Sequence, residues 1–406
     1  CWGIYLFRHG DYFALSNSFF RLLDHVKYRY PLTVNRDYCH HMLLFDLCSH
    51  ACLETAINEI RLVQRNVIFH IDVSKKSCQT EFIDYKENSI SPDSEEGIAI
   101  LDKWFEFWTN VLRGVAQHAE FIQADLTGGF DTRIPFLLLL NSGIDLAKIR
   151  IYSIKGEIHT YKEDYEIASQ ITEHYGLKLN QPLPKRESLH YSLADVSNIS
   201  LYHRQTFEMT RFFGANKTIE KLYCVNGYGG ETIRGNWLRF ASVEKWYQGR
   251  INLSKRYSRA LSDELARSVE TILKSGFRMV SDKYKIEDES SLYILQYLYH
   301  EGRCRHHFGK YTLGSYFLNT VTLSPALDPI IHTLRFDTPE CPDYKLLMAL
   351  IFTRYEPDLL KIPFQGKRKI EPGTIAFAKK INERFPRRLS TSKINSADNF
   401  HLQPID

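Results

Sequence analysis

The fold is decided by one short stretch, DLTGGFDTR at residues 125–133. The largely apolar residues 121–124 before it indicate a buried strand, and the apolar residues 134–140 after it indicate a buried helix. A strand, a tight turn with two glycines and a helix together present backbone N–H groups to a phosphate in many α/β proteins. The stretch therefore predicts a phosphate-binding loop.

Side chains within this loop add to the prediction. Thr127 and Thr132 supply hydroxyl donors, while Gly128 and Gly129 allow close approach of a ligand and unusual backbone dihedral angles. Asp131 places a carboxylate where a phosphate-bound Mg²⁺ needs one. The loop lacks the lysine of a Gly-Lys-Ser/Thr sequence, so a kinase-type loop is not indicated.

The composition is that of an ordinary folded protein. The 406 residues are 44% hydrophobic and 25% charged and carry a formal net charge of +4, which gives no case for a nucleic-acid partner. No apolar run approaches the roughly 20 residues that span a bilayer, so we expect no membrane partner. The eight cysteines show no framework spacing, and we expect reduced thiols and a cytoplasmic location.

Two domains are expected. Residues 1–90 indicate a small, mainly β domain with a hairpin at 4–16, a helical patch at 38–52 and a strand at 66–73. The segment 84–94 is polar and rich in Pro and Ser, and we interpret it as the linker between the domains.

Residues 95–406 form the second predicted domain. Residues 99–119 show helical periodicity, and strand–loop–helix units follow at 121–140, 149–175 and 221–234. This alternation predicts an α/β fold, a doubly wound parallel sheet with helices on it. The C-terminal part of the chain is expected to be mostly helical.

A second glycine cluster, VNGYGGETIRG at residues 225–235, also follows a predicted strand. In doubly wound sheets, the loops at the carboxyl ends of the strands meet in one crevice. Asp131 and Glu231 would then flank a Mg²⁺-bound triphosphate, and Gly227 would allow a nucleotide to pack on the backbone. The two loops together predict a nucleotide site.

Both loops resemble motifs of the asparagine synthetase family. Residues 126–132 (LTGGFDT) are similar to its Ser-Gly-Gly-x-Asp-Ser pyrophosphate loop, and residues 227–231 (GYGGE) to its Gly-Glu-Gly-(Ser/Ala)-Asp-Glu motif. The resemblance covers roughly residues 95–375 and includes weaker similarities in the family's order. These lie at residues 151–154, 164–168, 324–328, 344–347 and 362–369.

The resemblance implies an adenine nucleotide α-hydrolase-like synthetase domain that uses ATP and Mg²⁺. Such an enzyme activates a carboxylate by adenylation and then forms an amide with ammonia or an amine. The substrate would be a carboxylate-bearing small molecule, sugar or peptide. The implied ATP and pyrophosphate contacts are Leu126, Thr127, Gly128, Gly129, Asp131, Thr132, Ile154 and Gly227.

The resemblance also implies the metal and catalytic residues. Asp131 and Glu231 would hold Mg²⁺, so Glu231 counts among the catalytic residues. Lys369, or its neighbour Lys367, would stabilise the pentacoordinate α-phosphate. These roles follow from the family's motifs and are expectations here.

The sequence departs from the family at several positions. Thr127 replaces a serine and keeps the hydroxyl, while Arg133 adds a positive charge after the loop. Glu231 stands where the family has aspartate, and Thr232 where it has glutamate. A longer carboxylate still reaches Mg²⁺, so adenylation remains expected. Aspartate as the substrate is not expected.

The N-terminal part resembles a piece of the same family. Residues 4–30 and 55–60 are similar to the distal half of its glutamine-hydrolysing domain, and the half with the glutamine pockets is missing. Cys1 would be a nucleophile activated by its own α-amino group, yet Trp2 stands where glycine is expected. We expect a truncated or degenerate domain, or a fragment boundary.

Two further clusters carry weaker hypotheses. His40, His41, Cys48, His50 and Cys52 are metal-type ligands, but their spacing matches no zinc pattern. A basic cluster would bind an acidic substrate or lie on a solvated helix end. It consists of Arg303, Arg305, His306 and His307.

Other uses of the same adenylation chemistry stay open. The alternatives are macrocyclisation of a peptide, sulfur transfer to RNA, and a non-catalytic relative that keeps the fold. Sulfur transfer needs paired catalytic cysteines near the loop, and Cys224 alone is poor evidence for it.

Overall fold

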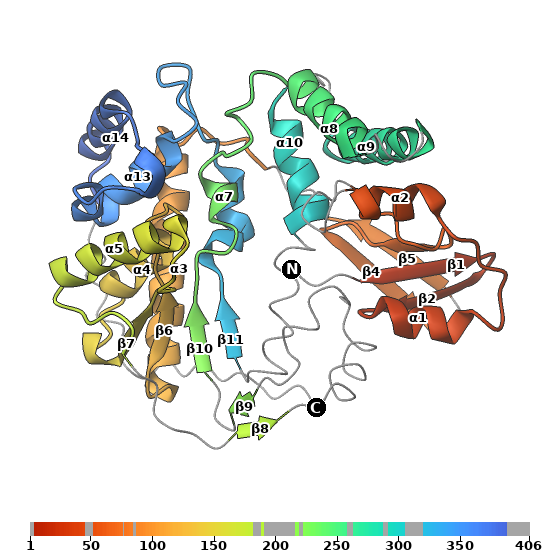
Figure 1. Cartoon of the computed structure of the whole chain (residues 1–406), viewed down its shortest axis with the longest axis horizontal. Coiled ribbons are helices and arrows are strands. Elements are labelled where there is room, and N and C mark those ends of the chain that lie inside the picture. Colours follow the sequence, from red (N-terminus) through yellow and green to blue (C-terminus); the bar gives the residue numbers. More distant parts are fainter. Residues whose placement is uncertain are drawn as a thin grey trace.

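A four-stranded parallel sheet organises the larger part of the molecule (Figure 1). Its strands are β6 (Ile122–Asp125), β7 (Ile149–Tyr152), β10 (Leu222–Val225) and β11 (Thr320–Leu323), in the order β11-β10-β6-β7. Every neighbouring pair in it is parallel. The predicted α/β class and the parallel sheet are therefore confirmed.

The computed structural model describes residues 4–44, 52–75, 77–83, 87–181, 188–190, 216–218, 222–257, 263–286, 291–304 and 320–387. Several residues that the sequence singled out lie outside these ranges, namely Cys1, Trp2, Cys48, His50, Arg305, His306 and His307. The side chains of Arg303 and Lys367 are also outside the description.

The strand order reverses between β6 and β10. From β6 the chain moves to β7 on one side, and it then returns to place β10 and β11 on the other side. Ligands of open α/β sheets bind at such a switch point, beyond the carboxyl ends of the two strands. Because each glycine loop directly follows one of these strands, both loops lie at the switch point.

The first helix of the sheet domain begins at a capping residue. Helix α3 (Glu95–His118) begins before the predicted 99–119 because the Ser94 hydroxyl accepts a hydrogen bond from the Gly97 N–H at 2.9 Å. Trp104 and Phe105 of α3 are fully buried in the main core. The other helices of this part are α4 (Arg133–Asn141), α5 (His159–His174), α7 (Gly230–Ile233), α13 (Leu346–Tyr355) and α14 (Pro372–Arg384).

The N-terminal part is a small antiparallel β region with its own core. Strands β1 (Tyr5–His9) and β2 (Tyr12–Ser16) form the predicted hairpin, and β3 (Ile60–Leu62) pairs with β1. The second sheet is the hairpin of β4 (Val67–Asp72) and β5 (Ser77–Phe82). Helices α1 (Phe19–Val26) and α2 (Arg36–Leu44) complete the region, whose core consists of Tyr5, Phe7, Leu22, Val26, Ile60 and Leu62.

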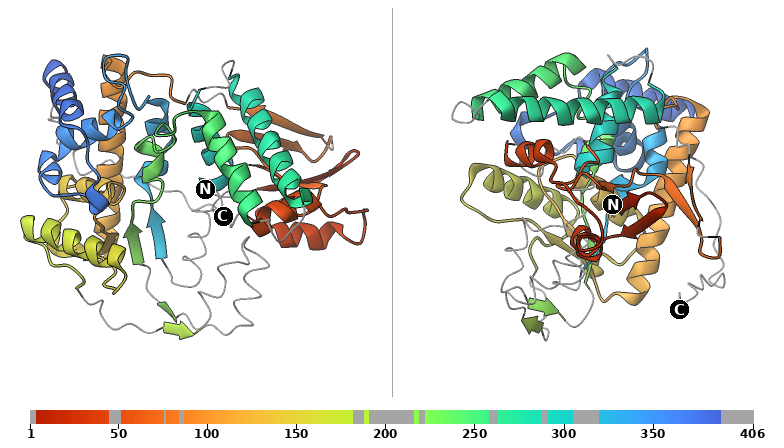
Figure 2. Two further views of the ribbon diagram at one scale, coloured as in Figure 1. Left: turned by 45° about the horizontal axis from the view of Figure 1, so that its top comes forward. Right: turned by 90° about the vertical axis from the view of Figure 1, so that its right-hand side faces the viewer.

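A helical layer joins the two parts. Helices α8 (Val243–Tyr257) and α9 (Asp263–Tyr284) run side by side in Figure 2, and α9 also contacts α2 of the N-terminal part. Helix α10 (Tyr293–Leu298) continues into a π-helical turn, η5 (Tyr299–Arg303). The remaining short elements are β8 (Ser188–His190), β9 (Asn216–Thr218) and the 3₁₀ helices η2 (Leu146–Lys148), η7 (Pro325–Leu327), η8 (Pro329–Thr333), η9 (Pro357–Leu360) and η10 (Gln365–Lys367).

Part of the polar segment that we interpreted as the linker is buried. Glu87 and Asn88 are buried, and the Asn88 N–H donates to the His332 carbonyl at 2.8 Å. Glu87 Oε2 lies 2.8 Å from His300 Nδ1, and Glu87 Oε1 accepts from the Arg65 guanidinium at 3.2 Å. The polar residues of this segment therefore serve a buried ion network, which sequence composition does not distinguish from solvent exposure.

Candidate functional site

A pocket of about 430 Å³ opens at the switch point of the sheet. It is lined from the ends of β6, β7 and β10, from both glycine loops and from the segment that precedes α14. The lining residues are Asp125, Leu126, Thr127, Gly129, Asp131, Thr132, Tyr152, Ser153, Ile154, Asn226, Gly227, Tyr228, Glu231, Gln365 and Arg368. Eight of the residues that the sequence predicted are thus brought together: Leu126, Thr127, Gly129, Asp131, Thr132, Ile154, Gly227 and Glu231.

The first glycine loop is shaped by its two threonines. The Thr132 hydroxyl accepts a hydrogen bond from the Thr127 N–H at 3.0 Å, and the Thr127 hydroxyl accepts one from the Gly129 N–H at 3.2 Å. The two hydroxyls lie 3.1 Å apart. In this state the threonines therefore hold the loop backbone, in addition to lining the pocket.

Gly128 faces the protein and not the pocket. Its N–H donates to Asp164 Oδ1 at 2.8 Å, and a Cβ at this position would lie 2.7 Å from Ile167 Cδ1 and 2.9 Å from Gln365 Cβ. Glycine is required here because α5 and the segment before α14 pack directly on the loop. Gly128 was expected to contact pyrophosphate, but it does not line the pocket.

The second glycine loop packs on the first without a side chain between them. A Cβ on Gly227 would lie 2.6 Å from the carbonyl carbon of Asp131, and a Cβ on Gly230 would lie 2.3 Å from Asp131 Cβ. Gly227 was expected to let a nucleotide pack on the backbone. The structure adds a second reason for glycine here, because the close packing brings Glu231 near Asp131.

Asp131 lies at the centre of this contact, with an unusual electrostatic environment. Burial raises the pKa of its carboxyl to about 6, although Arg234 beside it lowers the pKa. Arg234 Nη2 is 3.4 Å from Asp131 Oδ2, while Asp131 Oδ1 and Arg234 Nε are buried without a hydrogen-bond partner. Unsatisfied buried charges cost stability, and they are typical of sites that bind a charged ligand.

Glu231 is held from the opposite side by the π-helical turn. The Tyr299 hydroxyl, at the start of η5, donates to Glu231 Oε1. π-Helical turns are frequent at functional sites because they displace side chains from the regular helical register. Within the described ranges, His, Cys, Asp and Glu side chains form no group of three that could hold a metal ion. A Mg²⁺ here would take two protein carboxylates and further oxygens from phosphate and water.

The lysine predicted to be catalytic lies outside the pocket. Lys369 Nζ is 3.2 Å from Glu371 Oε2, and its side chain is 67% exposed. Its backbone carbonyl accepts a hydrogen bond from Lys345 Nζ at 2.8 Å. From this segment, Gln365 and Arg368 line the pocket instead. The sequence pattern alone does not reveal which of three consecutive basic side chains faces inward.

The positive charge that Arg133 adds after the loop does not line the pocket. The side chain is fully buried, and its guanidinium donates to the carbonyls of Leu359 at 2.6 Å and Ile362 at 3.0 Å, and to that of Pro363. Burial lowers its pKa to about 9. Arg133 therefore ties the first loop to the segment that precedes α14.

One side of the pocket is apolar. Leu126 is buried, and its N–H donates to the Tyr152 carbonyl at 2.8 Å. Tyr152 and Ile154 are 45% and 50% exposed at the end of β7. A flat apolar ligand group can pack on them.

Two of the weaker family-like elements have structural roles. Asp328 accepts hydrogen bonds from Trp108 Nε1 at 2.8 Å and from the Ile330 N–H at 3.0 Å, so it begins η8. Asp164 anchors Gly128. Both residues therefore support the site from outside the pocket.

Sequence reasoning missed several polar residues of the site. Five residues were not singled out, although all of them lie within stretches that the sequence analysis gave: Asp125, Asn226, Tyr228, Arg234 and Arg368. Burial raises the pKa of Asp125 to about 6. A signal was available for the loop residues, because ligands of open α/β sheets bind beyond the carboxyl ends of the strands at the switch point, where both loops lie.

The histidine and cysteine cluster near α2 is structural in the described part. His40 Nδ1 lies 3.0 Å from the Ser268 hydroxyl, which also donates to Asp37 at 2.6 Å. Burial lowers the pKa of His41 to about 4. Cys52 is also buried. These contacts join α2 to α9.

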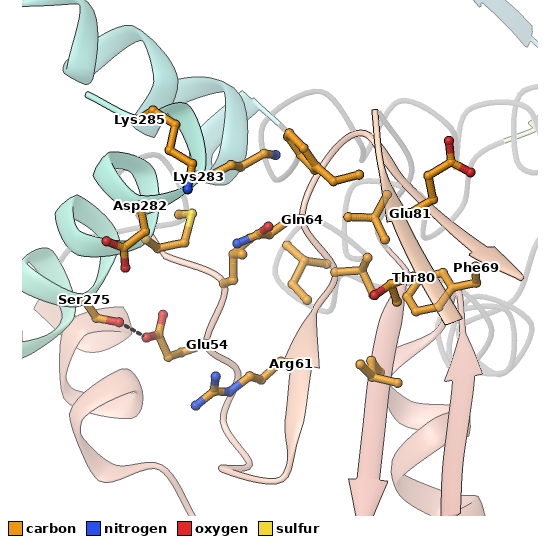
Figure 3. A pocket seen from close by; sticks show the side chains of 17 residues that line it. Glu54, Arg61, Gln64, Phe69, Thr80, Glu81, Ser275, Asp282, Lys283 and Lys285 are labelled. Atoms are coloured by element: carbon orange, nitrogen blue, oxygen red, sulfur yellow. Dashed lines mark hydrogen bonds between the residues drawn. The ribbon is translucent and has the colours of Figure 1, made fainter. Parts of the chain in front are cut away.

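A second pocket lies between the N-terminal strands and α9 (Figure 3). It has about 570 Å³ and contains none of the residues that the sequence predicted as functional. Apolar side chains from β4 and β5, such as Phe69 and Phe82, line it together with Lys283 and Asp282 of α9.

Comparison with known proteins adds no family. No family model matches the chain, and no curated protein matches its sequence. In the part of the chain that the structure describes, no helix has the length and apolar character needed to cross a membrane.

Proposed function

We propose that this protein is an ATP- and Mg²⁺-dependent ligase that activates a carboxylate by adenylation and then forms an amide. The observation that carries the proposal is the meeting of Asp131 and Glu231 in one pocket at the switch point of the sheet. Carboxylates that face each other at the ends of neighbouring parallel strands suit a metal-bound polyphosphate.

ATP fits the pocket with its base toward the apolar side. Tyr152, Ile154 and the buried Leu126 offer an apolar surface at the end of β7, and the triphosphate would lie toward the two glycine loops. Thr127 and Thr132 provide hydroxyls beside the phosphates. This orientation keeps the charged end of ATP near Arg368 and the base away from it.

The residues present fit Mg²⁺. Asp131 Oδ1 is buried without a hydrogen-bond partner, and Glu231 lies next to it across the contact that Gly230 permits. When bound, Mg²⁺ would neutralise phosphate charge and orient the leaving group. Arg234 would release Asp131 for that purpose and keep its own positive charge in the site.

The proposed reaction has two steps. A carboxylate oxygen of the substrate attacks the α-phosphorus of ATP, the bond to the bridging oxygen of the β-phosphate breaks, and pyrophosphate leaves. The nitrogen of ammonia or an amine then attacks the acyl carbon, AMP leaves with the bonding electrons, and the nitrogen loses a proton. The loop threonines and Arg368 surround the place where negative charge develops.

Sulfur transfer is disfavoured as the use of this chemistry. Burial raises the pKa of the Cys224 thiol to about 12, so the thiolate that sulfur transfer requires would not form at neutral pH. Peptide macrocyclisation would use the same two steps, with an amine of the same peptide as the nucleophile.

Pyrophosphate release tests the proposal. Purified protein is incubated with ATP, Mg²⁺, ammonium and a panel of small, sugar-derived and peptide carboxylates. We expect carboxylate-dependent release that requires Mg²⁺ and that Asp131→Asn abolishes, because the substitution removes the metal-binding charge.

Asp145→Asn is the matched control. Asp145 is exposed and precedes η2, at the amino edge of the same sheet, away from the pocket. Its variant should retain release within about a factor of two, since surface substitutions change little. Equal release by Asp131→Asn and wild type would overturn the proposed metal site.

A further inference from the structure

The segment between α13 and α14 is fastened to the first glycine loop by a buried arginine. Arg133 of α4 donates to three backbone carbonyls of residues 359–363, and its guanidinium carbon lies 3.9 Å from the centre of the Phe364 ring. These contacts join positions more than two hundred residues apart in the sequence. The Arg133 side chain has no measurable exposure.

Further contacts continue this attachment up to the pocket. Phe130 stacks on Phe364 with ring centres 4.1 Å apart, and the Gln365 N–H donates to the Gly128 carbonyl at 2.9 Å. The Gly366 N–H donates to Glu163 Oε1 at 2.8 Å. Residues 364–366 therefore follow the first loop and α5 closely, and the direction of the next residues is determined by these bonds.

This path decides which basic side chain enters the pocket. Arg368 lines the pocket beside Asp131, whereas Lys369 points to Glu371 in solvent. Gly366 adopts a φ of +64°, a left-handed conformation that L side chains rarely adopt. The chain therefore turns at Gly366, between the residues that contact the first loop and the residues that carry Arg368.

We propose that Arg368 is the cation that binds a phosphate group of MgATP in this pocket, and that Arg133 is the residue that positions it. The inference rests on the proposed function, and it replaces Lys369 in that role. Arginine suits both positions for physical reasons. Its planar guanidinium binds phosphate through two parallel hydrogen bonds, and a buried guanidinium can satisfy several carbonyls at once.

Calorimetric titration of MgATP into the full chain tests Arg368 directly. Arg368→Gln should weaken binding about 10- to 100-fold, the usual value of one hydrogen-bonded ion contact. Lys369→Gln is the matched control, since it removes the same charge one residue later. Its affinity should stay within about threefold of wild type, because exposed ion pairs contribute little.

The same titration with magnesium pyrophosphate locates the contact. Loss of affinity for both ligands places Arg368 at the β- or γ-phosphate, and loss for MgATP alone places it at the α-phosphate. Undiminished affinity of Arg368→Gln, with a loss in Lys369→Gln, would overturn the inference and leave the proposed function intact. Absence of MgATP binding to wild type would overturn both.

A double-mutant cycle tests the positioning role of Arg133. Arg133→Lys alone should weaken MgATP binding about tenfold. In a protein that already carries Arg368→Gln, the same substitution should weaken binding by less than about a further twofold, because its effect passes through Arg368. Additive losses would contradict that route. The cycle is read at a temperature where all variants are folded.

Arg354→Lys separates positioning from stability. The Arg354 side chain is likewise almost fully buried, donates to the Phe385 carbonyl at 2.8 Å and pairs with Asp102 at 2.6 Å, and none of these three residues lines the pocket. Both variants should lower the melting temperature, and only Arg133→Lys should also lower MgATP affinity. Equal affinity losses in the two variants would reduce Arg133 to a purely structural residue.

Discussion

The pocket at the carboxyl edge of the parallel sheet has about 430 Å³, and the pocket between the N-terminal strands and α9 has about 570 Å³. Both are lined by apolar and charged side chains. In the larger pocket, two of the charged groups have partners. Lys283 donates to Glu301 at 2.5 Å, and the Ser275 hydroxyl donates to Glu54 (Figure 3). In the smaller one, Asp131 Oδ1 has no hydrogen-bond partner.

Beside the larger pocket, both carboxylate oxygens of the buried Glu301 have hydrogen-bond partners. Glu301 Oε2 accepts from the Arg65 N–H at 3.1 Å, and Glu301 Oε1 accepts from the Tyr284 hydroxyl at 2.7 Å in addition to Lys283. Burial raises the pKa of Glu301, but Lys283 and Arg65 together lower it by more, so the net shift of the pKa is downward. Volume is therefore a poor guide to the functional site, and unsatisfied charge is a better one.

Breaking the network beside the larger pocket should produce the largest change in stability. Lys283→Met removes the ammonium group that pairs with the buried Glu301 carboxylate, and we expect a loss of about 3–5 kcal/mol in the free energy of unfolding. Lys283 is almost fully buried, with 2% of its side chain exposed. Urea denaturation followed by circular dichroism measures the loss.

Lys285→Met is the control for this prediction. Lys285 lines the same pocket and is exposed, so its variant should change stability by less than about 0.5 kcal/mol. MgATP affinity of the folded Lys283→Met protein should equal that of wild type. A loss of MgATP affinity in Lys283→Met but not in Lys285→Met would show that the two pockets are coupled, and it would contradict the functional difference between them.

Separating the two glycine loops should affect the smaller pocket instead. Gly227→Ala places a methyl group 2.6 Å from the Asp131 backbone, and we expect a cost of about 1–3 kcal/mol in stability from overpacking. Because Glu231 would move away from Asp131, MgATP affinity should fall at least about tenfold in calorimetry.

Gly114→Ala provides the matched substitution for Gly227→Ala. A Cβ on Gly114 meets no atom within 4 Å, and the residue lies inside α3, where alanine favours the helix. Stability should therefore rise slightly with affinity unchanged. If Gly227→Ala bound MgATP as tightly as Gly114→Ala, direct packing of the loops would not be needed for the site.

The smallest expected effect is a dependence on pH that belongs to the smaller pocket. Since burial raises the pKa of Asp131 to about 6, the carboxyl takes up a proton as the pH falls through that value and loses its charge for Mg²⁺. MgATP affinity should decrease up to about tenfold per pH unit below it. Titrations between pH 5 and 8, with buffer-heat correction, measure this dependence.

The sign for stability is opposite to that for binding. The folded-state pKa of Asp131 lies above the unfolded value of about 3.9, so the protonated form favours folding and this stabilisation is lost as the pH rises from about 4 through 6. Asp131→Asn should therefore flatten the pH dependence of the unliganded protein in this range. An unchanged profile would assign the dependence to other groups such as Asp125.

The sequence was sufficient to predict the parts of the site that depend on local order. The strand–turn–helix pattern around residues 125–133 and the second cluster at 225–235 predicted two loops, and the α/β fold brought them together. The small antiparallel region at the N-terminus was predicted by its hairpin pattern. These features depend on neighbours within a few residues.

Features that depend on distant contacts could not be predicted in this way. The carbonyl partners of Arg133 come from residues 359–363, and the support of Glu231 comes from Tyr299 on a π-helical turn. Whether Arg368 or Lys369 faces inward depends on the same long-range attachment. The family-like motif at residues 362–369 indicates which segment lies near the site, whereas the packing of that segment determines which of its side chains lines the pocket.

Titration of MgATP into the wild-type chain and into Asp131→Asn at pH 7.5 is the most direct test of the central claim, which is that the smaller pocket is a metal-nucleotide site. The account predicts one binding site in wild type, with a large loss of affinity in the variant and none in Asp145→Asn. Binding of equal strength in wild type and Asp131→Asn, or no binding in any of them, would contradict it.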